Sequence, residues 1–220
     1  MDKIDFKLKF KELYAPKQEP CIIEVPAMNF IMVDGHGNPN ETDGEYQKAV
    51  ELLYAFSYTI KMSRKKANTS NDIFSDYVVP PLEGLWWLSD KDDMDFTKKN
   101  QYCWTSMIRQ PDFITRTDYD NAILEINKKK PELDTSKARF EIFEEGLCVQ
   151  CMHLGPFDNE PVTLVKMDEF LKNNQLMVNI GAQTVEGRTH RHHEIYLSDP
   201  RKVILSARKT ILRHPIKKVE

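Results

Sequence analysis

A glutamate and a tyrosine two positions apart, Glu194 and Tyr196, are the residues of the sequence best suited to chemistry. They lie in residues 192–197, a segment that is expected to form a β-strand. Alternate side chains of a strand point to the same face, so His192 shares a face with Glu194 and Tyr196. His193 points to the opposite face. A carboxylate and a phenol placed side by side can provide a general base, a partner for a cationic ligand and a hydrogen-bond donor. The alternative is an ordinary solvated sheet face.

All three tryptophans of the chain lie between positions 86 and 104. Trp86 and Trp87 are adjacent, so a strand would point one indole to each face of the sheet. The repeat described below aligns Trp87 with Tyr196. Trp87 and Trp104 are therefore predicted to form an aromatic wall opposite Glu194, which suits flat, hydrophobic or cationic ligands. The alternative is a tryptophan-rich corner of the core.

Other candidate motifs for chemistry fail on spacing. His192 and His193 would face opposite sides of a strand, and Cys148 and Cys151 form a lone Cys-x-x-Cys without a second pair. The glycines of residues 35–40 do not match a phosphate-binding loop, and the sequence has no nucleophile elbow. Neither a metal nor a cofactor is expected. Four cysteines are too few for a disulfide scaffold in 220 residues.

Composition excludes several classes of protein. The chain has 31 lysine and arginine residues against 34 aspartate and glutamate residues, a net charge of −3. Direct binding to nucleic acid is not expected, because neutralising phosphates needs a basic excess. The sequence contains neither an apolar run long enough to span a membrane nor a signal peptide. A cytoplasmic protein without membrane contact is predicted.

Two short motifs occur twice and in the same order, which indicates an internal repeat. Residues 86–90 (WWLSD) resemble residues 195–199 (IYLSD), and residues 106–111 (SMIRQP) resemble residues 210–215 (TILRHP). Each pair of motifs follows an apolar strand ending in glycine and then a helical pattern. Apolar spacing predicts helices at about residues 42–66 and 160–174, a bridging helix at about 118–130 and a strand at about 138–143.

Each half therefore reads strand–helix–strand–strand, over about residues 25–115 and 138–216. These units form an α+β fold when they pack about a pseudo-twofold axis, which leaves a ligand groove between the halves. One domain over residues 1–220 is predicted. The alternative is that the repeat only builds a core.

Five segments resemble the GyrI-like small-molecule-binding family: residues 14–17 (YAPK), 33–40 (VDGHGNPN), 80–87 (PPLEGLWW), 108–113 (IRQPDF) and 193–200 (HEIYLSDP). The resemblance covers about residues 6–215. It implies the duplicated fold and the ligand-binding domain of multidrug-sensing transcription activators. In those domains a buried glutamate in an aromatic pocket binds cationic drugs.

Within the family, the chain is similar to the stand-alone cyclopropanoid cyclopropyl hydrolases. These enzymes detoxify DNA-alkylating natural products by adding water to a strained cyclopropane. The resemblance implies Glu194 as the acid/base residue and Tyr196 as its neighbour, with Trp87 and Trp104 as walls of an aromatic cage. It also implies four further ligand-binding candidates: His153, Phe157, Trp86 and Tyr58. Phe157 lacks the hydroxyl that the family often has after a Gly-Pro pair.

Three alternatives to a hydrolase remain at this stage. A module that only binds or sequesters xenobiotics needs the same cage. An effector sensor needs a separate DNA-binding chain, because about 25 residues before the first repeat strand cannot hold a helix-turn-helix. A protein inhibitor of a larger enzyme is the third. The expected partner is a small molecule, and the oligomeric state is not predicted.

Overall fold

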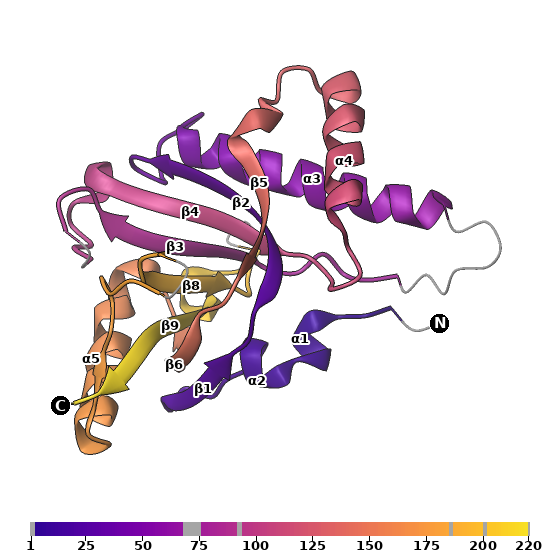
Figure 1. Cartoon of the computed structure of the whole chain (residues 1–220). Helices are drawn as coiled ribbons and strands as arrows, with labels where there is room; N and C mark the ends of the chain where they lie inside the picture. The colour runs from indigo at the N-terminus through magenta and orange to yellow at the C-terminus, as the bar shows by residue number, and fades with distance from the viewer. Residues whose placement is uncertain (1–2, 68–75, 92–93, 185–186, 200–201, 220) are drawn as a thin grey trace.

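The computed structural model describes residues 3–67, 76–91, 94–184, 187–199 and 202–219 (Figure 1). Pro200 of the family motif lies outside these residues. The helices and strands, in chain order, are α1 (Phe6–Lys9), α2 (Lys11–Tyr14), β1 (Cys21–Val25), β2 (Met28–His36), α3 (Glu45–Ala67), β3 (Leu82–Leu88), β4 (Tyr102–Arg109), α4 (Arg116–Lys129), β5 (Ala138–Phe143), β6 (Gly146–Leu154), α5 (Glu160–Asn173), β7 (Leu176–Val178), β8 (His192–Tyr196) and β9 (Lys209–Lys218). The predicted α+β class is confirmed.

The strands join in the order β1-β6-β9-β8-β3-β4-β2-β5, and β7 pairs with β9. All pairings between these strands are antiparallel. Outward from the centre, the first half contributes β3-β4-β2 and the second half contributes β8-β9-β6. The two halves therefore repeat one order, and they meet where β3 pairs with β8.

Helices α3 and α5 cover the same face of the sheet. Residues opposite one another in antiparallel strands point to the same face, and one such row contains Leu212, Glu194, Gly84, Ser106 and Val33. Val33 belongs to the core beneath α3, and Leu212 belongs to the core beneath α5. Figure 1 shows α3 beside the strands of the first half and α5 beside those of the second half. Glu194 thus lies on a central strand, on the face that both helices cover.

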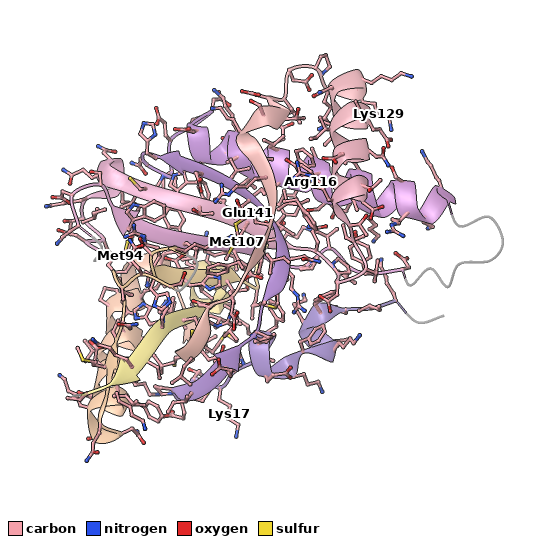
Figure 2. All side chains as sticks on the ribbon, in the orientation of Figure 1. Lys17, Met94, Met107, Arg116, Lys129 and Glu141 are labelled. Atoms are coloured by element: carbon pink, nitrogen blue, oxygen red, sulfur yellow. The ribbon has the colours of Figure 1, made fainter. Side chains whose placement is uncertain are left out.

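The opposite face packs against the short helices α1 and α2. Its core includes Phe6 and Leu13 from these helices and Met107 and Ile195 from the sheet. Figure 2 shows Met107 near the middle of the sheet. Ile195 alternates with Glu194 along β8, so the predicted division of this strand into two faces is confirmed.

Local sequence explains where the helices begin. In α3, Leu53, Phe56 and Ile60 are buried at three- and four-residue steps. The helix begins at Glu45 rather than near residue 42, because Asp43 has a φ of 57°, outside the right-handed helical region. In α4, Thr115 forms a capping box that starts the helix at Arg116. None of the helices among the described residues is long and apolar enough to cross a membrane.

Candidate functional site

The candidate site is built around Glu194, whose side chain is buried although it lies on a polar row of β8. Only 7% of Glu194 is exposed. Gly84 on β3 is directly opposite it, and a Cβ on Gly84 would lie 2.6 Å from Nε1 of Trp86 and 3.2 Å from the Tyr196 hydroxyl. The glycine therefore lets the Trp86 indole lean toward β8. There, Trp86 Nε1–H donates a hydrogen bond of 2.8 Å to the Tyr196 hydroxyl.

Aromatic rings from both halves surround this hydrogen bond. Phe157, just before α5, packs edge-on against Tyr196 with ring centroids 5.7 Å apart. Tyr46 of α3 packs on Trp86 at 5.3 Å and edge-on against Trp104 at 5.2 Å. Trp104 is fully buried on β4. Besides burial, the charge of Glu194 raises the pKa of both the Tyr46 and the Tyr196 phenol, so these rings border the carboxylate, an arrangement that favours flat or cationic ligands.

Two further residues, Glu160 and His214, join His192 and Glu194 in a buried polar cluster. His192 Nε2 lies 3.1 Å from Glu194 Oε1 and 4.0 Å from Glu160 Oε2. Its other ring nitrogen lies 2.6 Å from His214 Nε2. Glu160 is the first residue of α5, near the positive end of the helix dipole. It is completely buried, and neither of its carboxylate oxygens has a hydrogen-bond partner among the described residues.

Burial sets the protonation of these groups. It raises the pKa of the Glu160 carboxyl well above its usual range, and the negative charges of Glu194 and Asp158 act in the same direction. Burial and the charge of Glu194 raise the pKa of the Tyr196 phenol. Burial and the neighbouring histidines lower the pKa of His214 well below its usual value. The phenol and the His214 imidazole are therefore neutral near pH 7.

A second buried polar cluster lies on the opposite face of β8. His193 bonds Glu145 at 2.9 Å and Glu83 at 3.1 Å, and Arg213 lies 3.6 Å from Glu145. Burial alone would lower the pKa of His193, but the two carboxylates raise it to about 9. Tyr14 of α2 donates a hydrogen bond of 3.1 Å to Glu83. Each carboxylate here faces a positive charge, in contrast to the cluster around Glu194.

Residues 18–212 match the model of the GyrI-like small molecule binding domain. The chain belongs to the GyrI-like family. A crystal structure of an uncharacterized conserved protein from Listeria innocua is 49% identical, covers 98% of this chain and 100% of its own, and has a TM-score of 0.87. The crystal structure of a hydrolase from Listeria innocua is 48% identical with the same coverage and a TM-score of 0.83.

A more distant match shows the fold alone. The C-terminal domain of EcmrR is 12% identical to this GyrI-like chain, with a TM-score of 0.52 over 91% of this chain and 98% of that one. No curated protein matches the sequence. The family membership supports the predicted small-molecule ligand.

Trp86, rather than Trp87, lies beside Tyr196 in this GyrI-like chain. Trp87 points to the other face, where it packs against the core beneath α1 and α2 and the Arg191 guanidinium lies 4.5 Å from its ring. The prediction of Trp87 as a wall facing Glu194 does not agree with this placement.

The alignment of the two WWLSD-like motifs causes the error. Ser106 and Thr210 are equivalent in the second repeat motif; Ser106 pairs with Gly84, and Thr210 pairs with Tyr196. Gly84 is therefore the structural counterpart of Tyr196. The motif alignment matched Tyr196 with Trp87, three residues beyond Gly84. Because three is an odd number, this shift places the matched side chain on the opposite face of the strand.

Of the remaining predicted residues, Phe157 and Trp104 lie beside the site, whereas His153 and Tyr58 lie elsewhere. Phe157 contacts Tyr196, and Trp104 contacts Tyr46, which packs on Trp86. His153 is buried on β6, where its ring nitrogens lie 2.8 Å from the Thr163 hydroxyl and 3.1 Å from the Pro156 carbonyl oxygen.

Tyr58 lies apart from the site, on the outer side of α3. It is 53% exposed, stacks near Tyr54 and lines a cavity of about 290 Å³ between α3 and α4. His153 lines a separate cavity of about 260 Å³. Glu194 lines neither of these two cavities.

Two members of the buried polar cluster, Glu160 and His214, are not predicted from the sequence. An acidic residue in the first turn of a helix is ordinary, because it complements the helix dipole. His214 belongs to the repeat motif at residues 210–215, where its counterpart is Gln110. The replacement of glutamine by histidine between the two copies of the motif is the one feature of the sequence that distinguishes this position.

Proposed function

We propose that this chain binds planar hydrophobic or cationic small molecules at Glu194 and hydrolyses cyclopropane-bearing alkylating compounds. The observation that carries the proposal is the buried carboxylate of Glu194 within a surround of aromatic rings from both halves. The ion pairs described for Glu194 involve only His192, and a cationic ligand would add a second positive partner. The Listeria innocua relative that is named a hydrolase, at 48% identity, supports the catalytic part.

Hydrolysis of an activated cyclopropane asks little of a protein beyond position and proton transfer. Water oxygen bonds to a cyclopropane carbon while a carbon–carbon bond breaks, and its electron pair moves through the conjugated dienone to the carbonyl oxygen. That oxygen takes up a proton and becomes a phenol. Glu194 accepts the proton that water loses, and His192 holds the carboxylate in place at 3.1 Å. The rings hold the planar substrate and exclude other nucleophiles.

A non-catalytic binding protein is the alternative function. The Trp86 indole, which donates a hydrogen bond to Tyr196, and the neutral Tyr196 phenol present aromatic rings that can bind a cation without any proton transfer. A binding protein would sequester the same compounds and return them unchanged.

The direct test is to incubate the purified chain with a cyclopropane-bearing alkylator and follow the ring-opened product by mass spectrometry. We expect product to accumulate beyond one equivalent of protein, above the rate in buffer. Quenching of tryptophan fluorescence by the same compound without product would favour the binding protein. A folded chain that shows neither quenching nor product would contradict both functions.

The two adjacent tryptophans provide a matched pair for the binding step. We expect Trp86→Phe to weaken the binding of a planar cationic dye about tenfold, because the indole donates to Tyr196 and covers the ligand face. Trp87→Phe is expected to leave the dissociation constant within about twofold, since its ring is on the other face. Fluorescence titration measures both. The opposite ranking would place the ligand on the wrong side of the sheet for this proposal.

A further inference from the structure

We propose that Glu160, His192 and Glu194 bind a divalent transition-metal ion, for which Zn²⁺ is the representative. These residues come from two elements, the start of α5 and strand β8. The proposal goes beyond the proposed function and does not depend on turnover. With metal bound, Glu194 and His192 are ligands, so the base role of Glu194 and its hydrogen bond from His192 belong to the metal-free chain.

The ligand atoms are already close to the spacing that a tetrahedral metal needs. One atom from each of the three side chains lies within 4.8 Å of the others, and the His192 nitrogen is 3.1 Å and 4.0 Å from the two carboxylate oxygens. With metal–ligand bonds of about 2.0–2.2 Å, tetrahedral ligand atoms lie about 3.3–3.6 Å apart. The ligand atoms therefore need to move by about 1 Å to reach the tetrahedral spacing.

The number of positive partners distinguishes this cluster from the one on the opposite face of β8. Both contain two buried glutamates and a histidine. On the opposite face, Glu145 lies 3.6 Å from Arg213 and 2.9 Å from His193, so positive charges balance the carboxylates. In the proposed site, the ion pairs described for Glu160 and Glu194 involve only His192. Burial raises the pKa of Glu160, so its carboxyl holds a proton in the metal-free chain, and a divalent cation between the two glutamates takes the place of that proton.

Glu160 points to a ligand most directly. Its side chain is completely buried, and both oxygens are without a hydrogen-bond partner in the part of the chain that the structure describes. Buried polar atoms are nearly always bonded, so a group with two such oxygens calls for an explanation. A cation between Glu160 and Glu194 bonds these oxygens and displaces the proton that burial keeps on Glu160.

His214 supplies the support that metal-binding histidines usually have. It lies 2.6 Å from Nδ1 of His192, on the side away from the two carboxylates. A hydrogen on Nδ1 that is donated to His214 Nε2 leaves the lone pair of His192 Nε2 directed at the ion. The ring edge of Phe96 also packs against His192, with centroids 6.2 Å apart.

The ligand set identifies the class of ion. One imidazole and two carboxylates suit Zn²⁺ and the neighbouring divalent transition metals rather than Cu⁺, which prefers sulfur, or Ca²⁺, which prefers oxygen alone. Three protein ligands leave a fourth position for water or a ligand atom. Of the three proposed ligands, Glu194 has the most exposed side chain, 9% against 1% for His192 and 0% for Glu160, so solvent is nearest to the ion on the side of Glu194.

The test uses the full chain after treatment with a chelator and dialysis. We expect calorimetric titration to give one Zn²⁺ per chain, Co²⁺ to give visible absorption bands of a low-symmetry site, and Zn²⁺ to raise the melting temperature. Glu160→Gln keeps the shape of the side chain and is expected to weaken Zn²⁺ binding by about 100-fold and to abolish the shift in melting temperature. Glu169→Gln removes an exposed carboxylate farther along α5 and is expected to change the affinity less than twofold.

Three outcomes would overturn the metal site: a folded wild type that binds no Zn²⁺, equal affinity in wild type and Glu160→Gln, or saturation by Ca²⁺ in preference to Zn²⁺. Circular dichroism of each metal-free variant shows whether it is folded. Dye quenching of the metal-free chain separates this proposal from the proposed function. A chain that binds dye but no Zn²⁺ overturns the metal site alone, and one that binds Zn²⁺ but neither dye nor alkylator overturns the proposed function alone.

Discussion

Replacing Glu194 by glutamine is expected to lower the rate of cyclopropane hydrolysis by about 100- to 10,000-fold, the usual contribution of a general base. In the wild type, His192 Nε2 lies 3.1 Å from Glu194 Oε1. The glutamine amide keeps the volume of the buried side chain and an oxygen at this position. It cannot accept a proton from water. The loss is therefore expected in the rate at saturating substrate. Initial rates of ring-opened product, followed by mass spectrometry, measure it.

A suitable control for this experiment is Tyr58→Ala. Tyr58 is a ligand candidate from the family resemblance, but it is exposed on α3 and lines a different cavity. We expect its hydrolysis rate to remain within about twofold of the wild type. Turnover by Glu194→Gln at the wild-type rate would remove Glu194 from the mechanism, and a comparable loss in Tyr58→Ala would move the site to the groove between α3 and α4.

Replacing Arg213 by methionine is expected to lower the free energy of unfolding by about 3–5 kcal/mol, the cost of removing one partner from a buried ion pair. The guanidinium of Arg213 is buried beside Glu145 at 3.6 Å. It also donates to the Leu13 carbonyl oxygen at 2.8 Å and to Gln150 Oε1 at 3.0 Å. The substitution leaves Glu145 with His193 as its one positive neighbour among the described residues and removes a bond that holds α2 to the sheet. Urea unfolding followed by circular dichroism measures the change.

Arg116→Met is the matched control for this substitution. Arg116, the first residue of α4, forms an ion pair with Asp120 at 2.9 Å, and its side chain is 68% exposed. Exposed pairs of this kind contribute at most about 1 kcal/mol. A loss in Arg213→Met no larger than that in Arg116→Met would contradict the structural role given to the cluster on the opposite face of β8.

Local patterns predict much of this fold. The strand predicted at about residues 138–143 is β5, Ala138–Phe143, and the helix predicted at about 160–174 is α5, Glu160–Asn173. Alternation along residues 192–197 correctly separates Glu194 from His193, because the two-residue period of a strand depends on its own backbone alone. The extent of a single domain over residues 1–220 stays a prediction.

Long-range pairing is the part that local patterns do not contain. The motif alignment placed Trp87 opposite Glu194, whereas the pairing of β3 with β8 brings Gly84 there and Trp86 beside Tyr196. A register between strands far apart in sequence depends on packing over the whole sheet, and an odd offset reverses every face.

Patterns along the chain predict the α+β class, the repeat, the family and the placement of Glu194 and Tyr196 on one face of a strand. Which indole joins these two residues follows only from the folded chain, as does the approach of Glu160, from the start of α5, to His192 and Glu194. Periodicity depends on neighbouring residues, whereas a polar cluster forms only when side chains from separate elements meet. His192 is the clearest case: its orientation followed from the strand, and its partners Glu160 and His214 followed from the packing of α5 and β9.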